Sequence, residues 1–288
     1  MPSAEPTPRP GEVFDSVAQD YDDVRRGYPD TLVDAALARG ALNEESRVVE
    51  VGCGTGKLTE LLAARGLRVD AVDPGPSMIE IARRRVGDSP RVTFHVRRFE
   101  DVELPVGSFD AVFSATAFHW VDPAIGWRKA AELLRTGGLL ALLAHRSVAD
   151  EQSAEVEAGF REIWRAYVPE MKPWPPVPDA ESLLAGAAQR RANVSELWDW
   201  LLDERHELAV PEAEGLFRDA LAVTEIETVE ETLEHSIALV RTTSTYFRID
   251  PARRPSFEAD IRRLFERLGG TARFPLMTLV VTAVRAGD

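Results

Sequence analysis

The stretch that decides the fold is Val48-Val49-Glu50-Val51-Gly52-Cys53-Gly54-Thr55-Gly56. It begins as a short β-branched run, which is typical of a buried strand, and ends with glycines at alternate positions. Glycine adopts positive φ angles and lets the backbone approach a ligand closely. The stretch therefore predicts a strand that turns sharply into a helix, either as a bare tight turn or as a turn on which a ligand rests.

The same alternation of strand and helix continues on both sides of this turn. Apolar, β-branched runs predict strands, and helical spacing of apolar residues fills most of the intervals. We therefore expect an α/β fold with a doubly wound, mostly parallel seven-stranded sheet covered by helices on both faces. The predicted strands are residues 47–51, 67–72, 92–96, 109–115, 139–144, 221–229 and 276–284.

The chain divides into four expected parts. Residues 1–11 are Pro-rich and polar and are expected to be a disordered tail, whereas residues 12–146 carry the alternating pattern and the ligand turn. Residues 147–207 have helical spacing with a Pro-rich break, which predicts a helical cap insertion over the open end of the sheet. Strand pattern returns in residues 208–288, which are expected to complete the sheet.

The glycine spacing separates this turn from two common phosphate-binding turns. A dinucleotide turn follows G-x-G-x-x-G, whereas here the third glycine, Gly56, comes one residue early. The acid Glu50 is also unfavourable beside a pyrophosphate. A P-loop requires Gly-Lys-Ser/Thr, but Lys57 is followed by Leu58. A nicotinamide-dependent oxidoreductase stays open as an alternative.

The pattern Glu-x-Gly-x-Gly-Thr-Gly after an apolar strand resembles motif I of the class I S-adenosylmethionine-dependent methyltransferases. Further segments over about residues 11–145 follow the order of that family, among them Asp73 at the end of the second strand. The resemblance implies that Asp73 binds the ribose hydroxyls, since a carboxylate offers two acceptor oxygens. The cofactor-binding residues that it implies are Tyr21, Arg25, Tyr28, Glu50, Gly52, Gly54, Gly56, Asp73, Met78, Phe99, Glu100 and Ser114.

The N-terminal pattern Phe14…Tyr21…Arg25…Tyr28-Pro29 resembles a subgroup of the same family. The resemblance implies that the two tyrosines close over the cofactor and that Arg25 pairs with its carboxylate, because a planar guanidinium matches a carboxylate. We expect this segment to be mobile without cofactor. The alternative is an aromatic staple on the first helix.

The segment Phe118-His119-Trp120 follows the fourth strand, where the family places the acceptor. It resembles the small-molecule O-methyltransferases related to those acting on trans-aconitate and insect juvenile hormone acid. The resemblance implies that His119 is a catalytic base or a substrate contact and that Trp120 lines the pocket, although both are equally candidates for packing. Thr242 and Ser244 either line the pocket or cap the preceding helix.

The composition of the chain excludes several classes of binding partner. The 288 residues carry a formal net charge of −14, and an acidic surface repels nucleic acid. The single cysteine, Cys53, cannot form an internal disulfide, and the carboxylates show no metal-ligand spacing. No apolar run approaches the roughly 18 residues of a membrane span. We expect a cytoplasmic protein without nucleic acid, membrane or metal partners, and the sequence leaves its oligomeric state open.

These patterns predict an enzyme that moves a methyl group from S-adenosylmethionine to a small-molecule acceptor. Such a transfer asks the protein mainly to align the reactants in a dry site. A carboxylate acceptor needs no base, whereas a hydroxyl needs one, such as His119. We therefore expect O-methylation of a carboxylate or hydroxyl. The alternatives are N- or C-methylation of a small metabolite and a non-catalytic S-adenosylmethionine-binding protein.

Overall fold

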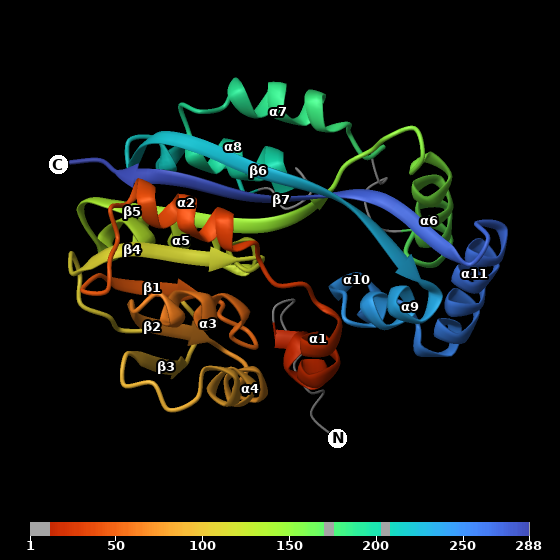
Figure 1. The fold of residues 1–288 in the computed structure, drawn as a ribbon, viewed down its shortest axis with the longest axis horizontal. Helices are drawn as coiled ribbons and strands as arrows, with labels where there is room; N and C mark the ends of the chain where they lie inside the picture. The colour runs from red at the N-terminus through yellow and green to blue at the C-terminus, as the bar shows by residue number, and fades with distance from the viewer. Residues whose placement is uncertain (1–11, 170–175, 203–207, 288) are drawn as a thin grey trace, which may run out of the picture.

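The structure is a computed structural model that describes residues 12–169, 176–202 and 208–287. The expected tail at residues 1–11 and parts of the expected cap lie outside the described residues. Within them, helices cover both faces of one seven-stranded sheet (Figure 1). The expected α/β architecture is therefore confirmed.

The sheet is mixed. Its strand order is β3-β2-β1-β4-β5-β7-β6. Neighbouring strands from β3 to β5 run parallel, whereas β7 is antiparallel to both β5 and β6. The strands are β1 Arg47–Val51, β2 Arg68–Asp73, β3 Val92–Val96, β4 Phe109–Ala115, β5 Leu134–Ser147, β6 Phe217–Thr232 and β7 Thr271–Arg285.

Two hydrophobic cores lie on opposite faces of the sheet, because neighbouring residues of a strand point to opposite sides. In β1, Val48 packs with α2 (Asp30–Arg39), α3 (Lys57–Ala64) and α4 (Pro76–Val86). Val49 packs with the other core, which contains α5 (Pro123–Leu133), α7 (Ala180–Ala188) and α8 (Val194–Leu202). Because both faces are covered, the four residues from Val48 to Val51 are all buried, Glu50 among them.

A third core lies on the extension of the two longest strands. The β6–β7 pair runs past the rest of the sheet and carries helices at its end (Figure 1). Their apolar side chains form one cluster with those of α6. These helices are α6 (Ala154–Tyr167), α9 (Leu233–Arg241), α10 (Ser244–Phe247) and α11 (Arg254–Arg267), with the short turn η5 (Pro251–Arg253) directly before α11. Another short turn, η4 (Pro211–Ala213), precedes the opposite end of β6 and packs against α5. The expected cap region thus divides, since α7 and α8 pack on the sheet face and α6 packs with α11.

The N-terminal helices were not expected from apolar periodicity. Helical pattern is evident only after Tyr28, yet η1 (Glu12–Val17) and α1 (Ala18–Val24) precede it. The sequence of α1, Ala-Gln-Asp-Tyr-Asp-Asp-Val, has one buried residue, Ala18. Contacts with α4 and α9, rather than an apolar stripe of its own, position this helix.

Candidate functional site

The carboxyl ends of the parallel strands meet at one edge of the sheet. The chain runs outward from β1 to β3 and then returns to place β4 on the other side of β1. In open α/β sheets, ligands bind at such a reversal, outside the carboxyl ends of the strands. Figure 1 shows α1 beyond the arrowheads of β1, β2 and β4, so this edge lies beneath the N-terminal segment.

The glycine turn lies at this edge, and all three glycines have left-handed φ angles of 68°, 52° and 83° at Gly52, Gly54 and Gly56. A Cβ on Gly52 would lie 2.3 Å from the Cβ of Ala117, and one on Gly56 would lie 2.9 Å from the Cα of Ala82. A Cβ on Gly54 would meet no atom within 4 Å. Two of the glycines therefore serve packing, and Gly54 is the one with open space above it.

Asp73 at the end of β2 joins two turns. One carboxylate oxygen accepts from the Gly54 N–H at 2.9 Å, and the other accepts from the Gly75 N–H at 2.8 Å. Burial, as the largest cause, raises the pKa of this carboxyl to about 6. The hydrogen bonds from the two N–H groups lower the pKa, and the negative charge of Asp15 raises it. Each oxygen keeps a second lone pair, so the carboxylate can still accept from a ligand.

Glu50 lies below the glycine turn. It is 1% exposed, and the Thr59 hydroxyl of α3 donates to its Oε2 at 2.6 Å. Burial raises the pKa of Glu50 to about 8, opposed by the Thr59 hydrogen bond and assisted by the charge of Asp73. In this conformation Glu50 is therefore buried, and its raised pKa favours the protonated carboxyl at neutral pH.

The N-terminal segment covers the ends of β2 and α4. Asp15 of η1 accepts from the backbone N–H groups of Ser77 at 2.7 Å and Met78 at 3.2 Å, and so caps α4. Met78 is 4% exposed and packs with Ala18, while Tyr21 packs against the same cluster. Met78, which the resemblance assigns to adenine, is thus covered by the segment in this conformation.

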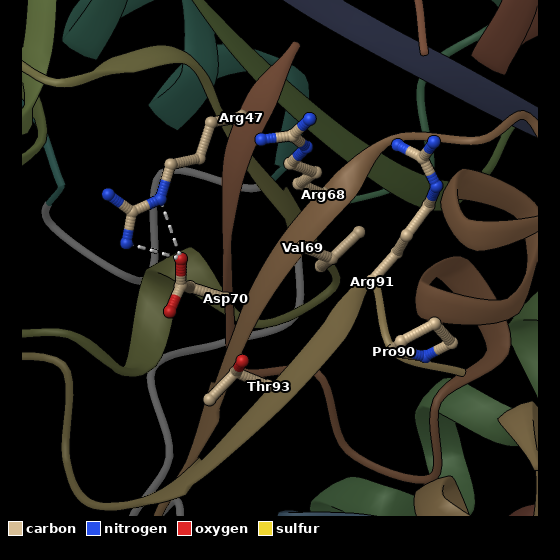
Figure 2. Close-up of a pocket in the computed structure, with 7 residues that line it drawn as sticks. All are labelled: Arg47, Arg68, Val69, Asp70, Pro90, Arg91 and Thr93. Carbon is tan, nitrogen blue, oxygen red and sulfur yellow. Dashed lines mark hydrogen bonds and ion pairs between the residues drawn. The ribbon is translucent and has the colours of Figure 1, made fainter. Parts of the chain in front are cut away.

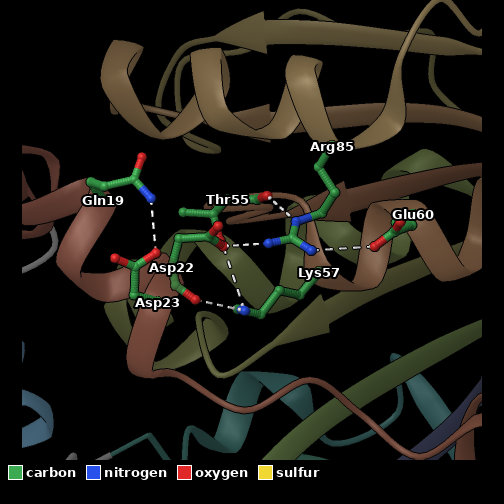
Figure 3. Close-up of polar contacts among 7 residues, drawn as sticks. All are labelled: Gln19, Asp22, Asp23, Thr55, Lys57, Glu60 and Arg85. Atoms are coloured by element: carbon green, nitrogen blue, oxygen red, sulfur yellow. Dashed lines mark hydrogen bonds and ion pairs between the residues drawn. The ribbon is translucent and has the colours of Figure 1, made fainter.

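An ionic latch, made of Asp22, Lys57 and Arg85, fastens α1 to the glycine turn (Figure 3). The Asp22 carboxylate lies 2.6 Å from the Arg85 guanidinium and 3.4 Å from the Lys57 ammonium. Lys57 also donates to the Asp22 carbonyl, and Arg85 donates to the Thr55 carbonyl in the turn. Burial tends to raise the pKa of Asp22. The pKa is nevertheless below its usual value, because Thr55 and Arg85 donate hydrogen bonds to the carboxylate and the charges of Lys57 and Arg85 stabilise its ionised form.

The connection from α1 to α2 brings predicted cofactor and acceptor residues together. Arg25 donates to the Thr242 hydroxyl at 3.1 Å and to its carbonyl at 2.8 Å, and its guanidinium lies 5.0 Å from the ring centroid of Tyr21. Thr242 is fully buried and donates to Leu239 at the end of α9. Ser244 is the first residue of α10. The structure thus shows a capping contact for Thr242.

The segment after β4 lies against the same N-terminal region. Thr116 has a φ of 52°, which is rare for a β-branched residue and marks local strain. The η2 turn (Phe118–Trp120) follows, with the rings of His119 and Trp120 4.6 Å apart. Phe14 of η1 meets Trp120 edge-on at 5.6 Å. Trp120 therefore contacts the N-terminal segment and His119 contacts Trp120, and the roles of both residues stay predictions.

Three other predicted residues are engaged by the protein itself. Phe99 is 4% exposed in the core, and Ser114 is 1% exposed and donates to the Val51 carbonyl at 2.8 Å. The Glu100 carboxylate accepts from Arg98 at 2.8 Å and from the Asp122 N–H at 3.1 Å. Their assignment to the cofactor continues to rest on the resemblance alone.

Sequence reasoning missed His145 at the end of β5. Its ring stacks on Tyr28 with centroids 5.0 Å apart and an angle of 8° between the planes. The Tyr28 hydroxyl in turn shares a hydrogen bond of 2.8 Å with the Thr116 hydroxyl. A polar residue ending an otherwise apolar strand, Leu139 to Ala144, was the signal that could have identified it.

A different hollow lies at the opposite edge of the sheet. Figure 2 shows it at the amino ends of β1, β2 and β3. Its volume is about 420 Å³. Its lining residues are Arg47, Arg68, Val69, Asp70, Pro90, Arg91 and Thr93. Because Asp70 is paired with Arg47 at 3.0 Å and the hollow is at the amino edge, we do not assign it to the reaction.

No helix in the part of the chain that the structure describes has the length and apolar character needed to cross a membrane. Within the same residues, no group of three or more His, Cys, Asp or Glu side chains is arranged to hold a metal ion.

The buried Glu50 makes stability depend on pH. Its carboxyl is protonated in the folded protein up to pH about 8 but ionises near pH 4.5 when unfolded, so the folded state loses stability as pH rises from 5 to 8. Glu50→Gln should remove this loss and gain on the order of 2–4 kcal/mol over the wild type by pH 8. Urea unfolding across this pH range measures it. Glu45→Gln, at an exposed position, is the control; wild-type and Glu50→Gln curves that run parallel would contradict the assignment.

The latch makes a prediction about the local stability of α1. Asp22→Asn leaves Lys57 and Arg85 without their shared anion, so we expect the α1 amides to exchange hydrogen about tenfold faster. Asp23→Asn is the matched control, because Asp23 is exposed and bonds only to Gln19 in Figure 3. Equal exchange rates in the two variants would show that the latch does not hold the helix.

The comparisons with known proteins match the part of the chain that forms this edge. Residues 49–142, from β1 into β5, match a family model described as a methyltransferase domain. An uncharacterized methyltransferase of Mycobacterium tuberculosis H37Rv is 40% identical over 130 residues, covering 45% of this chain and 51% of the relative. A ubiquinone biosynthesis O-methyltransferase of Xanthomonas campestris is 40% identical over 114 residues, covering 38% and 47%. The chain spans about half the length of these curated relatives.

Solved structures support the fold over nearly the whole chain. A protein from Anaeromyxobacter dehalogenans, described as a type II methyltransferase, aligns with a TM-score of 0.58 at 22% identity over 91% of this chain and 97% of that one. The cyclase SpnF aligns with a TM-score of 0.53 at 17% identity over 99% and 100%. The predictions of a methyltransferase enzyme and of S-adenosylmethionine as its cofactor are confirmed at the level of the domain: residues 49–142 of this chain are a methyltransferase domain.

Proposed function

We propose that the whole chain transfers a methyl group from S-adenosylmethionine to an oxygen atom of a small cytoplasmic molecule. The observation that carries the proposal is the Asp73 carboxylate, held by the Gly54 and Gly75 N–H groups at the carboxyl edge of the methyltransferase domain. The resemblance to the trans-aconitate and juvenile-hormone-acid enzymes points to a small acid or alcohol as the acceptor.

The residues at this edge fit the cofactor. Asp73 supplies free lone pairs for two hydroxyl donors, and Gly54 leaves open space where a nucleoside can approach the backbone. Met78 offers an apolar surface, but it is covered by Ala18 in the docked conformation. The η1–α1 segment must therefore shift when the cofactor enters, and the latch sets how easily it does so.

When bound, S-adenosylmethionine supplies a methyl group on a positively charged sulfur. The contribution of the chain is to exclude water and orient the acceptor. After the shift that admits the cofactor, the η1–α1 segment closes again over β1 and β4, where Phe14 contacts Trp120 in the docked conformation. Arg25 has a planar guanidinium for a carboxylate, in agreement with the pairing that the resemblance implies.

His119 is the base that we propose for a hydroxyl acceptor. It follows the strained residue Thr116 after β4, and its ring lies 4.6 Å from that of Trp120. In this role the neutral ring accepts the hydroxyl proton as the oxygen forms its bond to the methyl carbon. A carboxylate acceptor has no proton to lose, and His119 then only contacts it.

Oxygen is favoured over nitrogen or carbon as the methylated atom. The Xanthomonas relative is named as an O-methyltransferase, although the match covers less than half of either chain. N- or C-methylation of a metabolite stays as the alternative within the same chemistry. The SpnF likeness favours a second candidate, an S-adenosylmethionine-binding protein with a different activity, since that fold neighbour is a cyclase.

The proposal predicts that Asp73→Ala weakens S-adenosylhomocysteine binding. Loss of buried hydrogen bonds to a charged group costs roughly 1.5–3 kcal/mol, or about ten- to a hundredfold in affinity. Wild-type binding should also strengthen as pH rises through about 6, because the ribose hydroxyls donate to the ionised carboxyl. Calorimetry measures both effects, with thermal unfolding to confirm that the variant is folded.

Asp70→Ala is the matched control for this experiment. Asp70 lies on the same strand but pairs with Arg47 and His95, away from the carboxyl edge. Its substitution should leave the affinity within about threefold of the wild type. If Asp73→Ala binds as tightly as Asp70→Ala, the cofactor site is not at the end of β2.

His119 is tested by the pH dependence of transfer. A screen of radiolabelled methyl transfer to small carboxylic acids and phenols identifies acceptors and, if none is methylated, favours the binding-protein alternative. With a phenol acceptor, His119→Ala should lower kcat by about a hundredfold and remove the rise in rate near pH 6.5. An unchanged pH profile in His119→Ala would exclude His119 as the base.

A further inference from the structure

A polar cluster lies beside the proposed reaction edge, at the end of β5. It consists of His145 with Tyr28 from the α1–α2 connection, Thr116 from the end of β4, and Thr278 from β7. The cluster borders the transfer edge because the Thr116 N–H donates to the Leu143 carbonyl at 2.8 Å, two residues before His145. His145 is not among the residues used in the proposed mechanism.

The ring of His145 is held in one orientation. Its Nδ1 shares a hydrogen bond of 2.9 Å with the hydroxyl of Thr278, which is 3% exposed. Stacking on Tyr28 fixes the plane of the ring. The other ring nitrogen, Nε2, is buried, and no hydrogen bond of good geometry satisfies it within the described part of the chain. A buried polar atom of this kind needs a partner, and a bound ligand is one explanation.

The surroundings of the ring favour an anion. Burial, as the largest cause, and the charges of Arg26 and Arg25 together lower the pKa of His145 to about 4, although a hydrogen-bonding interaction with the Gly27 backbone opposes them. The ring is therefore neutral at physiological pH and can donate or accept at Nε2. Arg26 lies 3.3 Å from Glu227. The hydrogen bonds of Arg25 go to the neutral hydroxyl and carbonyl of Thr242, which leave its positive charge uncompensated.

We propose that His145 binds the acceptor through Nε2 and that the acceptor presents a carboxylate there. This inference rests on the proposed function and narrows its substrate class. One carboxylate oxygen takes the Nε2 hydrogen bond. The other oxygen forms a bond to the methyl carbon as the carbon–sulfur bond breaks, and the electron pair of that bond goes to sulfur. No proton is transferred, so the products are a methyl ester and neutral S-adenosylhomocysteine sulfur.

The experiment uses benzoate as a carboxylate probe and the neutral benzamide as its partner. Full-length protein labelled with ¹⁵N-histidine is saturated with S-adenosylhomocysteine, and the ring nitrogen resonances are followed during titration. We expect benzoate to shift the Nε2 resonance of His145 saturably and benzamide to shift it far less. His145→Ala should weaken benzoate binding about tenfold, whereas His235→Ala, on the exposed start of α9, should not.

Several outcomes would overturn the inference. His145 resonances that do not move with benzoate up to about 10 mM would do so without any variant, even if His145→Ala fails to fold. Equal benzoate affinity in wild type and a folded His145→Ala would do so as well. A loss of S-adenosylhomocysteine affinity in His145→Ala would assign the ring to the carboxylate of the cofactor instead. Failure of the proposed function is seen separately, as absence of S-adenosylhomocysteine binding to the wild type.

Discussion

The Asp73 carboxylate is the group on which the architecture of the site depends. Its two oxygens accept from the turn after β1 and from the turn after β2, so one buried anion fixes both loops at the carboxyl edge. Burial makes this arrangement costly, as the pKa of about 6 indicates. A charge kept in such a position at a ligand-binding edge is more typical of function than of stability. We propose that the ribose hydroxyls donate hydrogen bonds to the Asp73 carboxylate, in place of the water that burial removes from it.

The N-terminal segment is held over this edge by ion pairs and hydrogen bonds as well as by packing. Asp15 caps α4 directly beside Asp73, and Asp22 bridges Lys57 and Arg85 at the opposite side of the glycine turn. A helix with a single buried residue, α1, is thereby held over the edge. Water can replace the partners of such partly exposed ion pairs at a small cost in free energy. The segment can therefore be docked in one state and undocked in another.

The glycine turn was predictable because its geometry is encoded locally. Strand, turn and helix follow one another within Val48 to Leu58, and Gly54 and Asp73 lie as expected. Glu50 shows the limit, because only the fold reveals that the Thr59 hydroxyl donates to its buried carboxyl. The position of α1 depends on contacts between Asp22 and residues 35 and 63 positions away, and the His145 cluster joins residues more than 100 positions apart. No periodic pattern in the sequence reports such contacts.

The most direct test of the central claim is a crystal structure of the full chain grown with S-adenosylhomocysteine. The account predicts the nucleoside over Gly54, with both ribose hydroxyls about 2.7 Å from the Asp73 oxygens and the η1–α1 segment shifted to admit adenine beside Met78. Ligand density at another edge of the sheet, or ribose hydroxyls that bond elsewhere while Asp73 keeps only its two backbone N–H partners, would contradict it.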